Sequence, residues 1–309
     1  MMEKIYRLTP SLHDNLWGGN RLRAYGKESD ADRIAESWEL SFVPGEEARI
    51  ADGRTTSEAF GRDSWGKNCE RFEQFPVLTK FIDAREKLSV QVHPDDEYAL
   101  KNEGQYGKTE MWYVVDTEGD SAGLYMGLNG KYTKEEFSSA VADGTVEGML
   151  GRAEVKAGDV YFIPSRTVHA ILEGDLIFEI QQNSTLTYRL YDYMRRDKDG
   201  NLRPLHVDKA MAVTELDVYK PCKFDSDDNT LIGKCDYFET HIYKPYFTKM
   251  SIFATKDSFI SFTCVKGEGV VGGLCAKAGD SFFVPAGAGE IELSSDGVFD
   301  VIAVSVPRA

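Results

Sequence analysis

A short segment occurs twice in the chain, and this repeat constrains the fold more than any other feature of the sequence. Residues 156–164 read KAGDVYFIP and residues 277–285 read KAGDSFFVP, a constant separation of 121 residues (156 to 277, 164 to 285). Each copy has a glycine turn that leads into an apolar run ending at proline, which is typical of a β-strand and its boundaries. The repeat therefore predicts that one β-rich unit is present twice.

The apolar runs in the rest of the chain are short and end in turn residues. They favour strands, among them 75–83, 176–182, 247–254, 259–265 and 298–306. Many short strands of this kind are the signature of an all-β sandwich or barrel. Helices interrupt the pattern briefly: Thr133 and Glu136 form a capping box at the head of a helix reaching about Asp143, and Asp95 or Asp96 can cap a second helix that stops at Gly104.

The composition narrows the classes of partner. The chain has 309 residues, a formal net charge of −15 and a pI near 4.9, which disfavours binding to nucleic acid or to an anionic membrane surface. A phosphorylated ligand would need a local basic pocket. Five cysteines without CxxC spacing favour reduced thiols, and no apolar run has the length of a signal peptide core or a membrane span, so we expect a cytoplasmic protein.

The segment from Lys87 to His93 carries the first candidate metal ligands. Its apolar residues alternate with Ser89, Gln91 and His93, so in a strand the Gln91 amide and the His93 imidazole share one face. Such a pair can supply two ligands to one metal ion. The same alternation also fits a half-buried strand whose polar side chains face water.

Two further segments strengthen the metal interpretation. Glu110 opens the run EMWYVV, in which both alternating sets are apolar, so its carboxylate is expected to be buried and to need a positive partner. His169 lies in the apolar run TVHAIL, after the turn that ends at Pro164. If Gln91, His93, Glu110 and His169 converge, they form a four-ligand site suited to zinc, iron or manganese.

These residues resemble the motifs of the cupin barrels. The second cupin motif, Gly-x5-Pro-x-Gly-x2-His, matches Gly158, Pro164 and His169, with Arg166 where glycine usually stands. The first motif departs further, because Gln91-x-His93 replaces His-x-His and a helical insertion precedes Glu110.

Where the sequence departs from the usual cupin motifs, it resembles the type I mannose-6-phosphate isomerases, in particular their short bacterial branch. The resemblance rests on Gln-x-His-Pro at 91–94, ESWELS at 36–41, GKTEMW at 107–112 and TYRLYDY at 187–193, and it covers essentially the whole chain. It implies a mostly β fold of two jelly-roll-like cupin barrels with short helical insertions. The catalytic barrel would comprise residues 1–220. A degenerate barrel without metal would comprise residues 221–309, since the repeat offset aligns His169 with Glu290.

The resemblance also implies a reaction and roles for individual residues. The family interconverts mannose 6-phosphate and fructose 6-phosphate, in carbohydrate metabolism, through a cis-enediol. One Zn²⁺ per chain would be held by Gln91, His93, Glu110 and His169. Arg189 would stabilise developing negative charge, and Lys108 would orient a hydroxyl, bind phosphate or shuttle a proton. The further candidates for substrate contacts are Lys87, Ser89 and Arg166.

Two other functions remain open at the level of sequence. Two histidines and a carboxylate also suit a non-haem iron cupin that activates oxygen. A cupin can also keep the fold and bind a sugar as a non-catalytic or regulatory protein. The expected partner is in each case a small molecule, and the sequence does not determine the oligomeric state.

Overall fold

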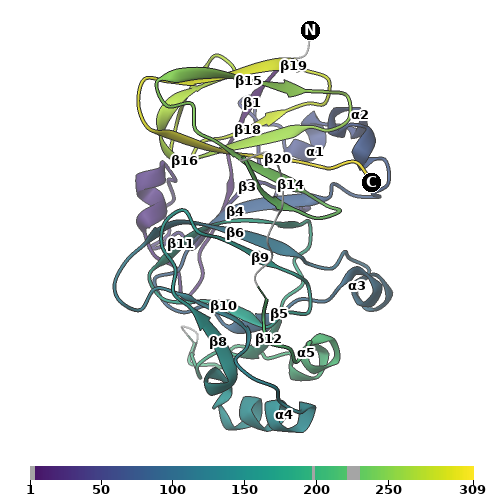
Figure 1. Cartoon of the computed structure of the whole chain (residues 1–309), viewed down its shortest axis with the longest axis vertical. Helices are drawn as coiled ribbons and strands as arrows, with labels where there is room; N and C mark the ends of the chain where they lie inside the picture. The colour runs from purple at the N-terminus through teal and green to yellow at the C-terminus, as the bar shows by residue number, and fades with distance from the viewer. Residues whose placement is uncertain (1–3, 197–198, 221–229) are drawn as a thin grey trace. The chain divides into compact units, whose positions relative to one another are not determined.

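The computed structural model describes residues 4–196, 199–220 and 230–309. These residues form two units, each built mainly from antiparallel strands (Figure 1). The central unit comprises residues 15–19 and 82–222, and the terminal unit comprises residues 1–14, 20–81 and 223–309. Strand β4 (Val77–Asp83) begins in the terminal unit and ends in the central unit.

The grouping of the N-terminal residues differs from the predicted division at residues 220 and 221. Strand β1 (Tyr6–Leu8) pairs with β18 (Ser281–Val284), so that Tyr6 lies opposite Phe283. The N-terminal segment therefore completes a sheet made by the C-terminal residues. The domain limits given above remain a prediction, and residue 221 lies outside the described residues.

The terminal unit has an apolar interior. One path of strands runs β1-β18-β16-β20-β14-β13, β15 pairs with β19, and β17 pairs with β16. The bounds are β13 (Leu231–Lys234), β14 (Glu239–Tyr243), β15 (Thr248–Ala254), β16 (Ile260–Val271), β17 (Leu274–Lys277), β19 (Gly289–Ser295) and β20 (Phe299–Ser305). The buried cluster between them includes Ile260, Phe262, Phe282 and Phe299. The N-terminal part adds β2 (Ser11–His13), β3 (Glu36–Leu40), α1 (Thr56–Ala59), α2 (Arg62–Trp65) and the 3-10 turns η1 (Arg21–Tyr25) and η2 (Lys67–Cys69).

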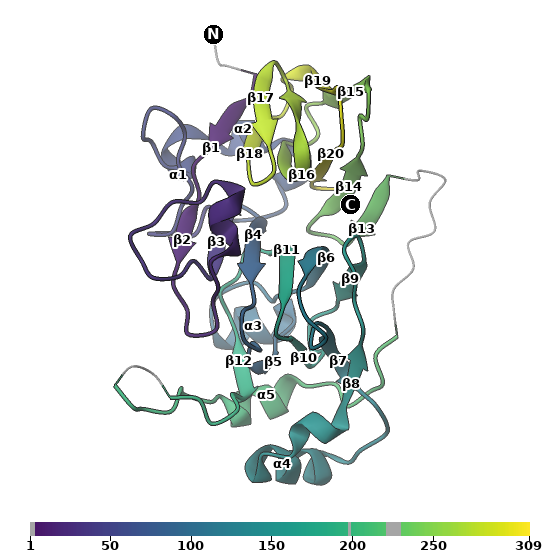
Figure 2. The ribbon, with the colours of Figure 1, turned by 90° about the vertical axis from the view of Figure 1, so that its left-hand side faces the viewer.

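The central unit has two layers of strands, which Figure 2 shows one above the other. One layer has the order β12-β5-β10-β7-β8, and the other includes β11-β6-β9. The bounds are β5 (Val90–Val92), β6 (Glu110–Thr117), β7 (Leu124–Leu128), β8 (Leu150–Ala153), β9 (Val160–Ile163), β10 (His169–Ile171), β11 (Asp175–Gln182) and β12 (Tyr188–Tyr191).

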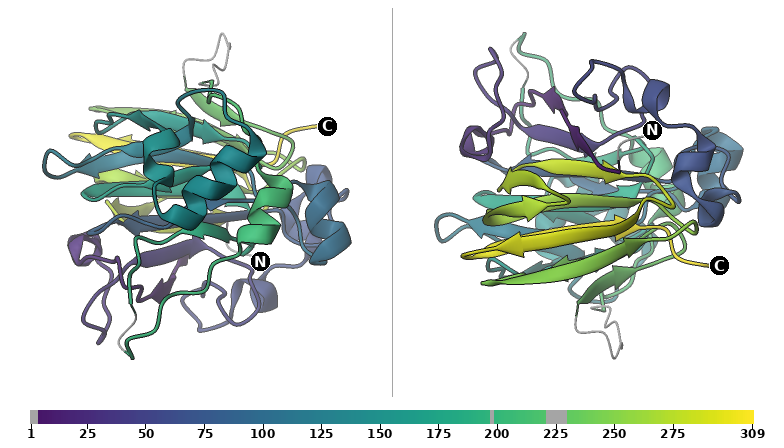
Figure 3. Two further views of the ribbon diagram at one scale, coloured as in Figure 1. Left: turned by 90° about the horizontal axis from the view of Figure 1, so that it is seen from below. Right: turned by 90° about the horizontal axis from the view of Figure 1, so that it is seen from above.

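Helices cover the outer face of the first layer. Helices α4 (Lys134–Asp143) and α5 (Val207–Val213) pack their buried side chains against Val90, Val92 and Leu190 (Figure 3, left). Because side chains alternate along a strand, Gln91 and His93 point to the opposite, inner face. The remaining helical segments are α3 (Asp96–Asn102) and the 3-10 turn η3 (Val146–Met149).

The predicted fold class is confirmed, with one refinement. The chain is mostly β with short helical insertions, and the capping residues are as expected: Thr133 and Glu136 form the capping box of α4, and Asp95 caps α3. The described strands are ordered in open sheets, as in a cupin-like sandwich, rather than in closed barrels.

Two other sequence features can be compared with the structure. Among the described residues, Cys69, Cys235, Cys264 and Cys275 form no disulfide with one another, whereas Cys222 lies outside the described residues. Within the described chain, every helix is too short or too polar for a membrane span. The longest of the α-helices described above, α4, has only 10 residues.

Candidate metal centre

Strand pairing places the polar side chains of three strands on the inner face of one layer. Gln91 of β5 lies opposite His169 of β10 on one side and opposite Arg189 of β12 on the other. Directly opposed residues of antiparallel strands point to the same face of a sheet. His93, two residues after Gln91, shares that face, so the sequence-predicted residues on these strands are brought together.

Glu110 approaches from the other layer. It begins β6, where it lies opposite Gln181 of β11 and Ile163 of β9. The four residues after it, 111–114, are all buried, and Glu110 itself is only 1% exposed. The carboxylate is therefore enclosed by apolar strands, as the sequence predicted. Because bulk water does not solvate it there, it needs a positively charged partner in the protein interior.

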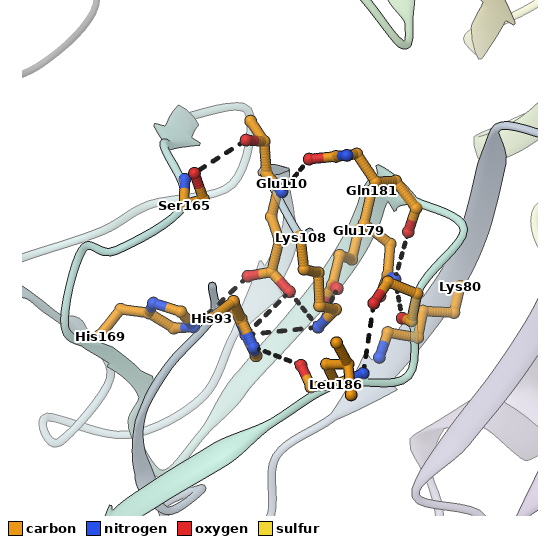
Figure 4. A network of polar contacts seen from close by, with 12 residues as sticks. Lys80, His93, Lys108, Glu110, Ser165, His169, Glu179, Gln181 and Leu186 are labelled. Atoms are coloured by element: carbon orange, nitrogen blue, oxygen red, sulfur yellow. Dashed lines mark hydrogen bonds and ion pairs between the residues drawn. The ribbon is translucent and has the colours of Figure 1, made fainter. Parts of the chain in front are cut away.

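The two imidazoles and the carboxylate converge in this interior (Figure 4). His93 Nε2 lies 3.3 Å from Glu110 Oε1, and His169 Nε2 lies 3.4 Å from Glu110 Oε2. One ligand atom from each of the three residues fits within a mutual distance of 4.8 Å. Both histidines are buried, with exposures of 1% and 0%. The spacing and burial are those of a metal-binding group.

The hydrogen bonds of the histidines direct their lone pairs into the centre. His93 Nδ1 is 2.7 Å from the carbonyl oxygen of Leu186, and His169 Nδ1 is 2.9 Å from that of Thr167. A carbonyl can only accept, so each Nδ1 carries the proton and each Nε2 presents a lone pair. This arrangement, in which the outer ring nitrogen is fixed by a backbone acceptor, is usual for histidines that bind metal.

Electrostatics favour the same protonation states. Burial, followed by the charge of Lys108, lowers the pKa of His93 to about 3, and burial likewise lowers the pKa of His169. Burial alone would raise the pKa of Glu110, but Lys108 and His93 outweigh it and hold that pKa well below its usual value. At neutral pH the centre therefore has two neutral imidazoles and one carboxylate, the forms that bind a divalent cation.

Unsatisfied atoms show that these residues fit a cation. Glu110 Oε2 and His169 Nε2 are buried, and neither has a hydrogen-bond partner among the described residues. Two electron-pair donors that face each other at 3.4 Å repel unless a positive charge lies between them. A nitrogen, nitrogen and oxygen donor set suits zinc and also iron or manganese.

Lys108 lies at the edge of this centre. Its ammonium contacts Glu110 Oε1 and lies 3.5 Å from Glu179 Oε1, while His93 Nε2 is 3.4 Å away. The side chain is buried between the two carboxylates. Lys108, a candidate named from the family resemblance, thus lies beside Glu110, whereas Glu179 was not predicted from the sequence. Its signal was a carboxylate inside the apolar run LIFEI, residues 176–180.

The three predicted substrate contacts lie in different surroundings. Arg166 has a φ of +72°, which explains why the related motif carries glycine there, and its guanidinium binds Asp95 and Glu215 at 3.1 and 3.2 Å. Lys87 pairs with Glu147 at 2.8 Å, and Ser89 is buried. Arg166 is thus occupied by carboxylates, and the roles of these three residues remain predictions.

The sequence matches one family model and several known proteins. The family model described as the phosphomannose isomerase type I catalytic domain matches residues 5–123. The chain is 36% identical over 301 residues to mannose-6-phosphate isomerase ManA of Bacillus subtilis, covering 92% of this chain and 94% of that protein. It is 39% identical over 228 residues to mannose-6-phosphate isomerase of Streptococcus mutans, covering 72% of this chain and 70% of the relative.

The fold is also similar to that of a solved isomerase structure. The crystal structure of the mannose 6-phosphate isomerase from Bacillus subtilis matches with a TM-score of 0.87 and 30% identity, over 98% of this chain and 99% of that one. The match therefore extends over both units of the chain.

Proposed function

The chain belongs to the type I mannose-6-phosphate isomerase family, and from this premise we propose that it interconverts mannose 6-phosphate and fructose 6-phosphate in a zinc-dependent reaction. The observation that carries the proposal is the buried meeting of two imidazole lone pairs and one carboxylate, within 4.8 Å of one another. Gln91 would complete the ligand set, since it shares the inner face with His93 and His169.

The reaction moves a proton between C1 and C2 of the sugar through a cis-enediol. It therefore needs a base, together with positive charge where the sugar oxygens become negative. Zinc bound by Gln91, His93, Glu110 and His169 would act as a Lewis acid toward a sugar oxygen. The ligand set has a formal charge of −1, so the site would keep a net positive charge.

Arg189 would supply a second positive charge. It lies opposite Gln91, and its side chain is half-buried beside the proposed ligands. Burial, followed by the nearby charge of Arg203, lowers the pKa of Arg189 below its usual value, but an arginine guanidinium still stays protonated at neutral pH. We therefore assign Arg189 to charge stabilisation and substrate orientation rather than to proton removal.

Lys108 would act as a donor to a substrate hydroxyl. Glu110 and Glu179 fix the position of its ammonium and supply its counter-charges. An ammonium held in this way is placed to donate a hydrogen bond from the edge of the metal centre to a bound sugar. Glu179 would then be a positioning residue for Lys108.

The test is an isomerase assay with controlled metal content. Purified protein should convert mannose 6-phosphate to fructose 6-phosphate, lose the activity after chelation and regain it with zinc. Metal-loaded protein that binds the sugar without turnover would instead be a non-catalytic cupin. Oxygen uptake with bound iron would indicate the oxygenase alternative. Either result would reject the isomerase proposal.

A further inference from the structure

The loop that carries Lys108 has an irregular and partly buried backbone. Residues 105–109, between α3 and β6, belong to no helix or strand. Gly107 and Lys108 are nevertheless buried, so their backbone polar groups are shielded from water and need partners within the protein. The contacts that supply these partners decide where the Lys108 side chain begins.

Two side chains hold the backbone N–H groups on both sides of Lys108. The N–H of Gly107 donates to Asp96 Oδ1 at 2.7 Å. The N–H of Thr109 donates to Gln182 Oε1 at 2.8 Å. The two acceptors are themselves joined, because Gln182 Nε2 donates to the same Asp96 Oδ1 at 2.9 Å. This pair of side chains, Asp96 and Gln182, is here called the clamp.

The chemistry of the two side chains makes the clamp specific. An ionised carboxylate accepts only, so both hydrogen bonds to Asp96 are charge-assisted. Gln182 is only 3% exposed, and it presents its amide oxygen to Thr109 and its amide nitrogen to Asp96. A hydrocarbon side chain of the same size at position 182 would leave the N–H of Thr109 without this acceptor and the carboxylate of Asp96 without this donor.

The loop also lies directly against the segment that follows the metal ligand His93. A Cβ at Gly107 would lie 2.6 Å from the backbone nitrogen of Asp96, so only glycine allows this approach. The N–H of Lys108 donates to the carbonyl oxygen of Pro94 at 3.0 Å. The clamp therefore fixes Lys108 relative to the strand end that carries His93.

A separate contact holds the backbone acceptor of His93. His93 Nδ1 donates to the carbonyl oxygen of Leu186 at 2.7 Å (Figure 4). The N–H of Leu186 donates to Ser184 Oγ at 3.3 Å, and the same hydroxyl donates to the carbonyl oxygen of Tyr106 at 2.9 Å. The orientation of His93 thus depends on Ser184, whereas the clamp acts on the residues beside Lys108. Opening the clamp should accordingly disturb Lys108 and leave the metal ligands in place.

The Lys108 ammonium needs accurate placement. It contacts Glu110 and lies 3.5 Å from Glu179 Oε1, at the edge of the metal centre (Figure 4). A lysine side chain is a flexible stem of four carbons, so contacts at its tip fix the ammonium only if the backbone is fixed as well. A misplacement of about 1 Å at an active site can lower a rate by about 10²-fold.

We propose that Gln182 and Asp96 are positioning residues for Lys108, which hold the backbone on both sides of it and thereby place its ammonium for a bound sugar. The proposal rests on the proposed function for the role of Lys108, but not for the restraint of the loop. Both residues act through Lys108 rather than on the substrate. Glu110 keeps its place without them, because β6 is paired with β11 on one side and with β9 on the other.

The main test is a double-mutant cycle between Gln182→Met and Lys108→Met. Methionine is close to glutamine in size but neither accepts from Thr109 nor donates to Asp96. Gln182→Met alone should lower the kcat for mannose 6-phosphate by about tenfold to a hundredfold. In the Lys108→Met background the same substitution should change kcat by less than about threefold, because the residue through which it acts is absent. Equal losses of kcat in the two backgrounds would indicate a general structural role and overturn the proposal.

Gln105→Met is the matched control. Gln105 is an exposed glutamine of the same loop, and its Oε1 accepts from Thr185 Oγ1 at 3.3 Å rather than from a backbone N–H beside Lys108. This variant should have the kcat of the wild type. Elemental analysis should show wild-type metal content in Gln105→Met and in Gln182→Met. Loss of metal from Gln182→Met would mean that the clamp acts on the metal ligands and would overturn the proposal.

Chemical modification separates the positioning from the reaction. Lys108 is only 5% exposed, so acetic anhydride should acetylate it slowly in the wild type, as mapped by mass spectrometry. Gln182→Met should acetylate at Lys108 about tenfold faster, because lost hydrogen bonds favour local opening. The exposed Lys101 of α3 should react equally in both proteins. Equal rates at Lys108 would overturn the proposal. This measurement would still decide the proposal if the wild type had no isomerase activity, in which case the proposed function alone would fail.

Asp96→Ala covers the case in which Gln182→Met does not fold. Asp96 is half-buried at the first residue of α3, so its truncation removes little core packing. The variant removes the acceptor shared by Gly107 and Gln182, and it should show the same loss of kcat and the same faster acetylation of Lys108. Wild-type values in both measurements would overturn the proposal.

Discussion

The two copies of the KAGD turn adopt the same local structure but lead to different interiors. Gly158 and Gly279 have φ values of +94° and +95°, and the Asp159 and Asp280 carboxylates accept from the backbone N–H of Lys156 and Lys277 at 3.0 and 2.9 Å. Each turn leads into a strand, β9 or β18, that pairs antiparallel with a long neighbour. The repeat thus encodes a scaffold, which can be built without a functional site.

The partner strands show where the two copies diverge. Ile163 of β9 lies opposite Glu110, whereas Val284, its equivalent in β18, lies opposite Ile260. Ile260 belongs to the apolar core of the terminal unit, and Glu290, the residue aligned with His169, is exposed. A buried charge is stable only with a partner, so Glu110 needs positive charge beside it, whereas Ile260 at the equivalent position needs only packing.

The largest expected effect comes from removing that charge. Glu110→Gln keeps the side-chain volume but removes the carboxylate, so we expect loss of bound metal and a fall in kcat/KM of more than about 10³-fold, beyond the range for one charge-stabilising group. Metal content by elemental analysis and the isomerase assay check this. Glu290→Gln is the matched control and should retain full activity. Metal retention in Glu110→Gln would contradict the assigned centre.

A smaller effect is expected from Arg189, which contacts substrate in the proposal but does not bind metal. Arg189→Ala should lower turnover by about 10²-fold or more, as loss of a charge-stabilising group does. The metal content should remain that of the wild type, which distinguishes this variant from Glu110→Gln. Steady-state kinetics on protein of known metal content make the comparison, and a near-normal kcat would remove Arg189 from the mechanism.

The two turn glycines allow a test of the scaffold itself. A Cβ at Gly279 would lie 2.0 Å from the carbonyl oxygen of Tyr25, whereas a Cβ at Gly158 would meet nothing within 4 Å. Gly158→Ala should therefore cost about 1 kcal/mol from backbone strain alone, and Gly279→Ala about 2 kcal/mol or more. Denaturant titration of both variants gives the difference. Equal losses would mean that the clash is relieved by a local shift.

The smallest effect is expected from shortening Ile260, which occupies in the terminal unit the position equivalent to Glu110. Ile260→Val removes one methylene from the apolar core and should lower the free energy of unfolding by about 1 kcal/mol. Isomerase activity and metal content should be unchanged, because the terminal core takes no part in the proposed chemistry. Chemical denaturation and the activity assay together check the prediction. A marked loss of activity in the folded variant would show that the scaffold comparison is incomplete.

Much of the central site could be predicted because its signals are local. Alternation in 87–93 placed Gln91 and His93 on one face, and the apolar runs around Glu110 and His169 predicted burial. The contacts of Glu179 and Arg203 could not be predicted in this way. Glu179 lies in β11, the sixth strand after Lys108 in sequence order, and Arg203, which pairs with Asp192, follows the turn at Tyr193 and Met194, whose φ values are both +55°.

The grouping of the chain into units shows the same limit. The repeat predicted a second β-rich unit, but nothing local in residues 6–8 indicated that they pair with β18. Pairing between distant strands depends on which edges are left free when the sheets assemble, and that information is spread over the whole chain.

The sequence by itself determined the residue types of the metal centre, the face on which Gln91 and His93 lie and the repeated turn, because side-chain alternation and glycine geometry act over a few residues. Only the tertiary structure decided that His93, Glu110 and His169 meet within 4.8 Å and that Arg195 and Arg203 both pair with Asp192. The physical reason is that burial in a two-layer sandwich brings the inner faces of separate strands together. The cost of isolated charge in that interior then requires the charged groups to find partners there.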